Sequence, residues 1–353
     1  MKVVSLVGAR PQFVKEAVVG KALDAKGIDE VLVHSGQHFD VNMSDVFFQT
    51  LHIRQPGFNL HVGSGTHGEM TGKIMVGFEK LLLDIKPDIV LVYGDTNTTL
   101  AGALVAAKLK IDTAHIEAGI RMQPKKMPEE INRVVVDSVA DILFCPSKHA
   151  VNNLRKEGRI DNVHFTGDVM YDLFLMMKER FTFDVFNRLD LKKGQYVLLT
   201  LHRDYNVDDP DKLQKILEKL HRVSSDIQVV FPMHPRTRKR ISEFQLEQYL
   251  KKLTIIEPCD YLNMMGLLTA SWKVITDSGG LQKEAYFAGK ECLVLMPDTG
   301  WVELVENKCS FLCNENNLEL LVTKRSLRQH ARLPDIYGKG DAARLIAETL
   351  MSL

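Results

Sequence analysis

The feature that most constrains the fold of this chain is an alternation of short apolar runs with longer amphipathic stretches. The short runs are rich in β-branched residues, as buried strands are, and the stretches between them have helical composition. Strands that alternate with helices indicate βαβ units and parallel sheets. The predicted strands form two series, at residues 3–7, 30–34, 89–92, 113–116, 142–145 and 163–165, and then at 196–200, 228–232, 253–257, 273–276 and 291–295.

Two series of strands predict two Rossmann-like domains, and a length of 353 residues exceeds the size at which a single core usually splits. We assign residues 1–176 to the first domain, 177–195 to a crossing segment and 196–336 to the second domain. Residues 337–353 have helical spacing, and we expect them to return and pack on the first domain. In such sheets ligands bind at the carboxyl ends of the strands, so two facing domains would share one cleft.

Composition excludes several classes of function. The 45 basic and 45 acidic side chains cancel, so no bulk field attracts nucleic acid. The five cysteines include no CxxC pair and no zinc set, which favours buried free thiols and predicts no metal site. The N-terminal apolar run is too short for a signal peptide, and no run approaches membrane-spanning length. We expect a cytoplasmic protein with no membrane association.

The most informative motif is the turn Asp277-Ser278-Gly279-Gly280, which follows an apolar run and precedes a helical segment. A small, glycine-containing turn lets backbone N–H groups approach a phosphate, and the helix N-terminus adds positive charge. Ordinary turn chemistry also explains this motif when it is taken alone. Glu284 lies about one and a half turns into the helix, where it can accept hydrogen bonds from a ribose.

Further polar residues follow the predicted strands of the first half. Arg10 stands at the tip of the first strand and Lys15 about one turn inside the next helix. Both cations can meet phosphate or sugar oxygens, and both can equally be solvated surface charges. Gln37 and His38 follow the second strand.

Acidic residues follow the next strands. Asp95 comes after the third strand, where it can also be a helix N-cap. Glu117 comes after the fourth, and Glu129 with Arg133 lies in the segment beyond. Carboxylates crowded near phosphate-binding groups acquire shifted pKa values and suit proton transfer.

The second half places His202 and Arg203 after its first strand and His234 after its second. A histidine and an arginine directly after a strand can serve a leaving diphosphate, one as proton donor and one as fixed charge. The basic run at 236–240 is interpreted as a solvated helix start or a cleft contact. Residues 8–15 lack the spacing of GxGxxG and of the Walker loop, which disfavours a dinucleotide dehydrogenase and an NTPase.

Taken in order over essentially the whole chain, these motifs resemble the non-hydrolysing UDP-N-acetylglucosamine 2-epimerases, which are similar in fold to GT-B glycosyltransferases. The matching segments are residues 8–15, 36–38, 94–96, 115–119, 128–133, 202–203 and 277–284. The resemblance implies an α/β fold of two Rossmann-like domains whose parallel sheets face a central cleft. It also implies a UDP-sugar substrate, no cofactor, and a homodimer.

The family assigns roles to the matching positions. It implies that Arg10, His202 and the turn hold the diphosphate, that Glu284 binds the ribose, and that the carboxylates act on the sugar. We therefore expect the catalytic residues to be Asp95, Glu117, Glu129 and His202. The expected substrate-binding residues are Arg10, Lys15, Gln37, His38, Arg133, Arg203, His234, Ser278, Gly279, Gly280 and Glu284. The implied reaction is anti elimination of UDP to a 2-acetamidoglucal and re-addition with inversion at C2.

Departures from the common family pattern bear on the substrate. Asp204-Tyr205-Asn206 follows His202-Arg203 where Arg-Glu-Asn or Ala-Glu-Asn is common, and residues 299–303 read Thr-Gly-Trp-Val-Glu in place of Thr-Glu-Arg-Pro-Glu. Residues 38–40 depart from a region linked to allosteric activation. These segments look like a subgroup that includes enzymes acting on UDP-2,3-diacetamido-glucuronate. A carboxylated sugar needs extra cations, and the candidates are Arg236, Arg238, Lys125 and Lys126.

Four alternatives remain beside the plain epimerase. The first is a 2-epimerase of a modified UDP-sugar, and the second is a GT-B glycosyltransferase that shares the diphosphate site. The third is a catalytically silent UDP-sugar sensor. The fourth is a hydrolysing 2-epimerase, which releases free N-acetylmannosamine and UDP.

Overall fold

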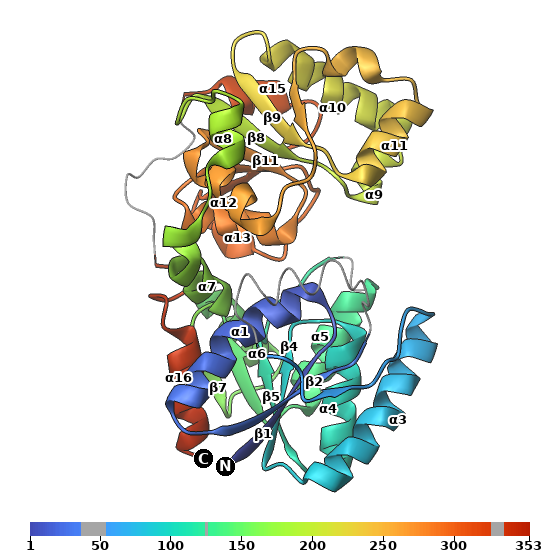
Figure 1. Ribbon diagram of the computed structural model, residues 1–353, viewed down its shortest axis with the longest axis vertical. Helices are drawn as coiled ribbons and strands as arrows, with labels where there is room; N and C mark the ends of the chain where they lie inside the picture. Colours follow the sequence, from blue (N-terminus) through green and yellow to red (C-terminus); the bar gives the residue numbers. More distant parts are fainter. Residues whose placement is uncertain (37–53, 124–125, 326–334) are drawn as a thin grey trace. The chain divides into compact units, whose positions relative to one another are not determined.

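The computed structural model describes residues 1–36, 54–123, 126–325 and 335–353, with the backbone but not the side chain of Arg10. Gln37, His38 and Lys125 lie outside the described residues. The chain divides into two compact units, one made of Met1–Met176 with Asp335–Leu353 and one made of Met177–Pro334. Each unit is a parallel β-sheet with helices packed around it (Figure 1). The predicted α/β class with two parallel sheets is confirmed.

The first unit has seven strands in the order β3-β2-β1-β4-β5-β6-β7, and every described pair is parallel. The strands are β1 (Lys2–Val7), β2 (Asp29–His34), β3 (Phe58–Asn59), β4 (Ile89–Tyr93), β5 (Asp112–Ile116), β6 (Ile142–Cys145) and β7 (Val163–Phe165). The helices are α1 (Arg10–Ala25), α3 (His67–Ile85), α4 (Asn97–Leu109), α5 (Pro128–Val139), α6 (Lys148–Lys156), α7 (Val169–Met177) and α16 (Ala342–Met351).

The second unit has six parallel strands in the order β10-β9-β8-β11-β12-β13. They are β8 (Tyr196–Thr200), β9 (Gln228–Pro232), β10 (Thr254–Ile256), β11 (Lys273–Thr276), β12 (Glu291–Val294) and β13 (Ser310–Leu312). The helices are η1 (Lys178–Arg180), α8 (Asp184–Arg188), α9 (Asp204–Val207), α10 (Pro210–Val223), α11 (Pro235–Glu243), η2 (Glu247–Leu250), α12 (Tyr261–Ala270), α13 (Gly279–Phe287), α14 (Val302–Glu306) and α15 (Leu318–Thr323).

Side-chain caps fix where several helices begin. Thr66, Thr96 and Ser147 each accept a hydrogen bond from a backbone N–H of the first turn of α3, α4 and α6. Asp209 and Asp260 do the same for α10 and α12. Such caps satisfy N–H groups that have no partner inside the helix.

Both sheets consist largely of buried apolar residues, as parallel sheets usually do. The core of the first unit joins the strands to α3 and α4, with Ile74, Phe78 and Leu82 fully buried. The core of the second unit joins its strands to α10 and α15. No helix among the described residues is long and apolar enough to cross a lipid bilayer. The five cysteines are free thiols, four of them buried and Cys259 partly exposed.

The strand order of each sheet reverses once, and this positions the candidate site. In the first sheet β1 lies between β2 and β4, and in the second β8 lies between β9 and β11. The loops after the two central strands of each sheet therefore run to opposite faces and leave a crevice at the carboxyl ends. The segments after β1, β4, β8 and β11 carry the predicted motifs around Arg10, Asp95, His202 and Ser278.

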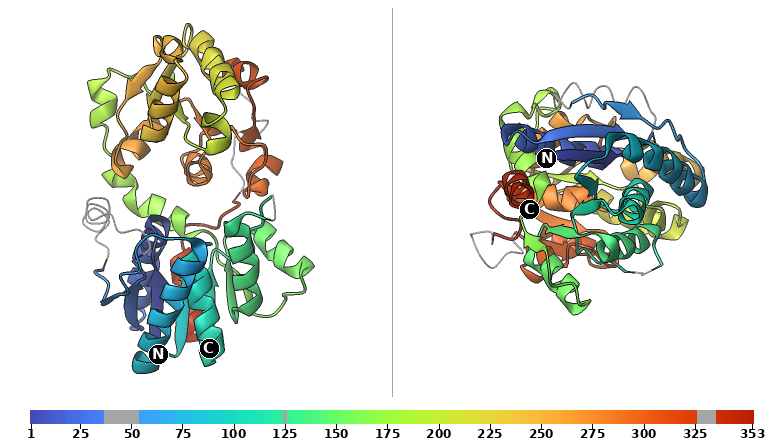
Figure 2. Two further views of the ribbon diagram at one scale, coloured as in Figure 1. Left: turned by 90° about the vertical axis from the view of Figure 1, so that its right-hand side faces the viewer. Right: turned by 90° about the horizontal axis from the view of Figure 1, so that it is seen from below.

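The structure differs from the sequence expectations in some short elements. Strands β3 and β13 are not predicted, and the two residues of β3 are too few to produce a strand pattern. Residues 177–195, the expected crossing segment, hold the short helices η1 and α8, which the sequence pattern did not predict. Helix α16 packs against α1, and both termini of the chain lie close together in the first unit (Figure 1, Figure 2).

Candidate active site

Glu117 is the central carboxylate of the first unit. It follows β5, and its backbone φ of 76° is in the left-handed region, which a residue with a side chain rarely adopts. Its carboxylate forms an ion pair of 2.7 Å with the ammonium of Lys15, and both side chains are about nine-tenths buried. Lys15 is therefore not a solvated surface cation. Strained backbone at a buried, charged position is typical of functional sites.

Gly94 makes room for this pair. It follows β4 with a φ of 66°, and a Cβ atom built on it would lie 3.2 Å from the Lys15 ammonium and 3.9 Å from the Glu117 carboxylate. A side chain at this position would therefore push against the pair as well as strain the turn. The loops after β4 and β5 and the start of α1 thus meet at one point.

Asp95 lies next to Gly94, and its carboxylate forms an ion pair with the guanidinium of Arg133 from α5. Thr96, not Asp95, caps α4. Asn132 donates a hydrogen bond of 2.8 Å to the backbone carbonyl of Asp95. The side chain of Asp95 remains about a quarter exposed, so it is held by α5 and still reaches solvent.

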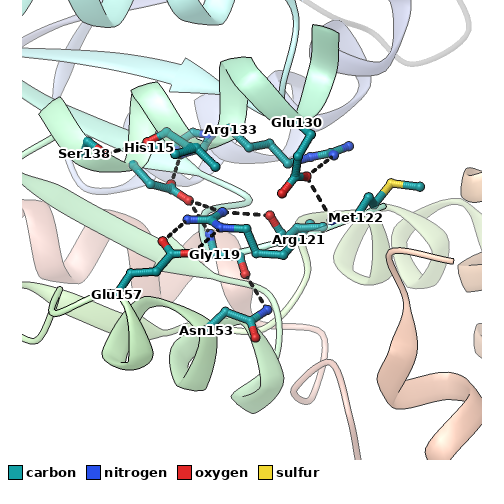
Figure 3. Close-up of polar contacts among 12 residues, drawn as sticks. His115, Gly119, Arg121, Met122, Glu130, Arg133, Ser138, Asn153 and Glu157 are labelled. Carbon is teal, nitrogen blue, oxygen red and sulfur yellow. Dashed lines mark hydrogen bonds and ion pairs between the residues drawn. The ribbon is translucent and has the colours of Figure 1, made fainter. Parts of the chain in front are cut away.

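Glu129 and Glu130 stand side by side in the first turn of α5 but have opposite environments. Glu129 is exposed. Glu130 is buried and accepts hydrogen bonds of 2.9 Å from the backbone N–H of Met122 and 3.0 Å from Arg133 (Figure 3). Glu130 therefore fixes the loop before α5, and Glu129 is the carboxylate of the two that is open to solvent.

A buried network beneath these carboxylates is not predicted from the sequence. His115 is fully buried. Its Nδ1 atom lies 2.6 Å from the carboxylate of Asp137, and its Nε2 atom lies 2.7 Å from the carbonyl oxygen of Gly94. Asp137 also accepts from Arg121 at 2.7 Å, and Arg121 reaches on to Glu157 at 2.6 Å (Figure 3). Burial would raise the pKa of Asp137, but the charge of His115 and its hydrogen bond outweigh it and lower that pKa.

Gln12 organises the turn after β1. Its side-chain oxygen accepts hydrogen bonds from the backbone of Gly8 and Ala9 at 2.8 and 3.0 Å, and its amide donates to the carbonyl of Tyr93 at 2.8 Å. Gln12 thereby joins the segment after β1 to the end of β4. Its place in the segment that matches the family is the one sequence signal that could have identified it.

Asp277 organises the site of the second unit. It follows β11, is fully buried, and accepts hydrogen bonds from the backbone N–H groups of His202 and Arg203 at 2.9 and 2.8 Å. The side chain of Asn206 also donates to it at 3.2 Å. The Nδ1 atom of His202 lies 3.1 Å from the carboxylate, so the ring is oriented and its Nε2 remains available.

Burial and hydrogen bonding shift the pKa of Asp277 in opposite directions. Burial alone would raise the pKa of the carboxyl group, because it penalises the charged form. The hydrogen bonds from His202 and Arg203 outweigh that effect and hold the pKa of Asp277 below its ordinary value. The carboxylate is therefore ionised and able to orient the imidazole.

His234 and the cations around it lie at the end of β9. The ring of His234 is 5.5 Å from that of His202, and its Nδ1 accepts from the N–H of Arg236 as the cap of α11. Arg203 is exposed. Arg236 pairs with Asp208 at 2.5 Å and Arg238 pairs with Glu257 at 2.6 Å. The two arginines considered for a carboxylated sugar thus already have carboxylate partners.

The predicted phosphate turn opens α13. Ser278 is the N-cap, Gly279 and Gly280 are the first helical residues, and Gly280 is exposed. Neither glycine has a positive φ, and a Cβ atom on Gly280 would meet no atom within 4 Å. Neither the backbone conformation nor the protein's own packing requires glycine at Gly280. Glu284 lies in the same helix and is largely buried.

The comparisons identify the family. A family model described as UDP-N-acetylglucosamine 2-epimerase matches residues 21–351. The chain belongs to this family. A curated member, UDP-2,3-diacetamido-2,3-dideoxy-D-glucuronate 2-epimerase of Pseudomonas aeruginosa, is 44% identical, and the alignment covers 100% of both chains. The family members matched here are named as epimerases, which are isomerases.

Solved structures of family members share the fold. The UDP-GlcNAc 2-epimerase of Methanocaldococcus jannaschii, in complex with UDP-GlcNAc and UDP, is 40% identical with a TM-score of 0.88, covering 100% of both chains. The UDP-GlcNAc 2-epimerase of Neisseria meningitidis, bound to UDP-GlcNAc, is 29% identical with a TM-score of 0.87, also covering 100% of both. The GT-B-like class expected from the resemblance is therefore confirmed.

Proposed function

We propose that this protein is a non-hydrolysing UDP-N-acetylglucosamine 2-epimerase that interconverts UDP-GlcNAc and UDP-ManNAc. The observation that carries the proposal is the buried ion pair of Glu117 with Lys15, held at the strand ends beside Asp95 by left-handed backbone. Family membership supplies the reaction class. The 40% identical relative that binds UDP-GlcNAc and UDP supports the substrate class.

The reaction has two parts, which are a proton transfer at C2 of the sugar and the departure of UDP from C1. A base takes the C2 proton while the bond between C1 and the UDP oxygen breaks, which forms a C1=C2 double bond. UDP then returns to C1 as a proton arrives at C2 from the other face. In the proposal the first unit supplies the acid and base from Asp95, Glu117 and Glu129.

The second unit supplies the site for the leaving group. The turn Ser278-Gly279-Gly280 offers backbone N–H groups at a helix N-terminus, which stabilise a diphosphate. His202, oriented by Asp277, meets the departing oxygen, and the exposed guanidinium of Arg203 adds positive charge around it. The ring of His234, 5.5 Å from that of His202, completes this part of the proposed site. A Cβ atom on Gly280 would meet no protein atom within 4 Å, so packing does not explain the glycine. The close approach of a ligand to the backbone would explain it, and this supports the assignment.

The decisive experiment follows the C2 hydrogen by NMR. UDP-GlcNAc incubated with the protein in heavy water, without added cofactor, is expected to incorporate deuterium at C2 and to give the manno isomer. An unlabelled C2 would contradict the proposal. Transfer of the sugar to an acceptor would instead indicate a glycosyltransferase, and free N-acetylmannosamine with UDP would indicate a hydrolysing enzyme.

Carboxylate variants separate catalysis from binding. We expect Asp95→Asn, Glu117→Gln and Glu129→Gln each to lose about 100-fold or more in turnover, the usual contribution of a general acid or base. UDP affinity, measured by calorimetry, should change little. Glu69→Gln, at an exposed position in the first turn of α3, serves as the matched control. A protein that binds UDP but loses nothing in these three variants is a sensor rather than an enzyme.

A carboxylated UDP-sugar is the second candidate substrate. The observation that favours it is the 44% identical relative named for UDP-2,3-diacetamido-2,3-dideoxy-D-glucuronate. Product analysis with both nucleotide sugars measures the preference directly. A kcat/KM at least tenfold higher for the diacetamido-uronate would assign the protein to that substrate.

We also propose that the protein acts as a homodimer in the cytoplasm. The family resemblance supports the dimer, and the free thiols of all five cysteines suit a reducing compartment. Light scattering of the purified protein checks the mass, for which a dimer of the 39.9 kDa chain is expected.

A further inference from the structure

Both ring nitrogens of His115 face hydrogen-bond acceptors. Nδ1 lies 2.6 Å from a carboxylate oxygen of Asp137, and Nε2 lies 2.7 Å from the backbone carbonyl oxygen of Gly94. Because a carbonyl oxygen has no proton to donate, Nε2 must be the donor in the second contact. A neutral imidazole carries a proton on only one nitrogen, so the first contact needs another proton, either on Nδ1 or on the carboxyl group of Asp137.

The surroundings of Asp137 place that second proton on the ring. The other carboxylate oxygen of Asp137 accepts hydrogen bonds of 3.0 Å from the backbone N–H of Gly119 and 2.7 Å from the guanidinium of Arg121 (Figure 3). An arginine keeps its charge in proteins, and a carboxyl group that faces it and accepts several hydrogen bonds favours the ionised form. The contacts are therefore satisfied together when Asp137 is a carboxylate and His115 is an imidazolium.

The same two residues contact the two backbone turns next to Glu117. His115 binds the carbonyl of Gly94, and Asp137 binds the backbone N–H of Gly119. The backbone φ angles of Gly94, Glu117 and Gly119 are 66°, 76° and 80°, all in the left-handed region. Glycine adopts this conformation freely, but glutamate does not, so the backbone of Glu117 needs support from neighbouring contacts. The pair of His115 and Asp137 supplies that support at both turns.

The imidazolium also lies close to the proposed catalytic carboxylates. A Cβ atom on Gly94, the residue that its Nε2 contacts, would lie 3.9 Å from the carboxylate of Glu117. Asp95 is the next residue of the chain. His115 is fully buried, and water screens a buried charge much less than a charge at the surface. Its positive charge therefore favours the ionised form of the carboxylates that take the C2 proton in the proposed reaction.

Other charged groups around His115 come from α1, from α5, from the end of α6 and from the loops after β4 and β5. They form the ion pairs Lys15–Glu117, Asp95–Arg133, Glu130–Arg133, Asp137–Arg121 and Glu157–Arg121. The neighbours of His115 in the sheet are the apolar Val92 of β4 and Leu143 of β6. Cys145 at the end of β6 is a neutral thiol, because burial raises its pKa. Among these described groups, Asp137 is the anion that holds the proton on the ring.

We propose that His115 and Asp137 are positioning residues for the acid–base chemistry, in which a buried imidazolium fixes the turns around Glu117 and favours its ionised form. The inference rests on the proposed function, in which the carboxylates of the first unit act on the sugar. It extends that function to a charged pair behind the residues that are proposed to touch the substrate.

The first measurement reads the charge of the ring in the unaltered protein. NMR of the protein labelled with nitrogen-15 histidine distinguishes a ring nitrogen that carries a proton from one that does not. We expect both ring nitrogens of His115 to carry protons at neutral pH. The signals are assigned through the backbone resonances of His115, so the measurement needs no variant that has to fold. A ring with one bare nitrogen overturns the proposal.

Asp137→Asn removes the charge of the pair and keeps its contacts. The amide can donate to a bare Nδ1 of His115 while its oxygen still accepts from Arg121, so the ring becomes neutral with Nε2 bonded to Gly94. We expect one bare ring nitrogen by NMR. We also expect kcat to fall about tenfold, because the carboxylates are less well positioned and less readily ionised. KM for UDP-GlcNAc should stay within about twofold of the parent, because the pair acts through other residues.

The pH profile of kcat/KM separates the role of the charge from a merely structural role. Without the imidazolium the carboxylates bind a proton more tightly, so the acid limb of the profile should move up by about one pH unit in Asp137→Asn. His115→Gln keeps a donor for Gly94 but has no charge, and it should move the limb in the same direction. A loss of folded protein alone would lower the amplitude of the profile and leave the acid limb in place.

Two control variants make the same chemical changes away from the pair. Asp141→Asn alters a carboxylate that accepts a hydrogen bond of 2.9 Å from the backbone N–H of Thr113, at the other end of β5. His221→Gln alters a ring whose Nδ1 lies 3.0 Å from the carbonyl oxygen of Tyr249 in the second unit. Both variants should keep the parental kcat and the parental acid limb.

The outcomes separate this inference from the proposed function. If the parent does not exchange the C2 hydrogen of UDP-GlcNAc, the proposed function fails and the positioning role fails with it. If the parent exchanges that hydrogen, the inference alone is overturned by a neutral His115 ring in the parent or by a parental acid limb in either folded variant. A doubly protonated ring, together with an acid limb that moves up in Asp137→Asn, supports it.

Discussion

At the scale of single residues, Asp277 shows how one buried carboxylate organises a site. Four hydrogen-bonding groups point at it, two from the backbone and two from the side chains of His202 and Asn206. Because the carboxylate is ionised and fully buried, it both holds the loop after β8 and orients the imidazole.

Asp277→Asn is expected to uncouple these roles. The amide keeps the size of the side chain but brings two N–H donors toward groups that are donors themselves. We predict a loss of turnover of about 100-fold, the scale of a misoriented general acid or base. Steady-state kinetics measures the loss. Asp226→Asn, at an exposed position of the same unit, should keep parental activity.

Glu16 and Glu30 form a second buried acidic site, remote from the chemistry. The two carboxylates lie beside Gly20, and each has a buried oxygen with no hydrogen-bond partner. Burial, and then the negative charge of Glu30, raises the pKa of Glu16 well above its ordinary value. The folded protein therefore binds a proton here that the unfolded chain releases.

This shift predicts a pH-dependent effect of Glu16→Gln. The parent's stability is full below the ordinary pKa of 4.5 and falls as pH rises through the raised pKa, since the unfolded state then binds fewer protons. Gln does not titrate and so removes the cost of taking up a proton, and the variant should be more stable at neutral pH, by about 1.4 kcal/mol for each unit by which the pKa is raised. The gain should vanish below pH 4.5. Urea titration at both pH values checks it, with exposed Glu79→Gln as control.

At the scale of elements, Lys273 shows how a strand can cap a helix. Its side chain leaves β11 fully buried, and its ammonium donates to the carbonyls of Leu321 and Val322 at 3.1 and 3.3 Å. These carbonyls lie in the last turn of α15, where helices leave acceptors without partners. The negative end of the helix dipole favours a cation at the same place.

Lys273→Met should therefore destabilise the second unit. The thioether side chain fills the space but leaves buried carbonyls without donors, for which we expect a loss of about 2–4 kcal/mol. Thermal unfolding measures it, and amide exchange in α15 should accelerate first. Lys252→Met removes an exposed hydrogen bond of 2.7 Å to Ser225 in the same unit and should have almost no effect. Equal melting temperatures for the two variants would contradict the assigned role.

At the scale of the whole molecule, the chain leaves the first unit after Met176 and returns at Asp335. Helix α16 then packs on α1, with Ile346 and Leu350 fully buried. Asp172 of α7 accepts from the N–H of Ala343 at 2.8 Å and so caps α16 from another helix. The first unit is therefore complete only after the second has been synthesised.

Removing residues 335–353 should destabilise the first unit selectively. Loss of the two buried aliphatic side chains alone costs about 3–6 kcal/mol, a large part of a typical domain's stability. Hydrogen exchange should show faster exchange in α1 and β1, with β8 and β11 unchanged. A chain shortened only by the exposed residues 352–353 is the control, and parental exchange in α1 after the longer deletion would refute the prediction.

The sequence predicted the strands better than it predicted the contacts in the candidate site. Most strands were predicted within a residue of their observed ends, because buried parallel strands are continuous apolar runs. The environment of Lys15 was not predictable, since a lysine in a helix is equally compatible with solvent and with the buried pair that it forms with Glu117. The supports Gln12 and Asp137 were missed because their partners come from other elements.

The sequence alone determined the α/β class, the two series of strands and the turn at 277–280 that opens α13, because these depend on neighbours within a few residues. The tertiary structure decided which side chains meet. His202 and Asp277 are 75 residues apart, Asp95 and Arg133 are 38 apart, and Trp301 and Gly279 are 22 apart. Such contacts are set by strand order and crossover connections, which bring distant strand ends to one edge of a sheet, and no local pattern encodes them.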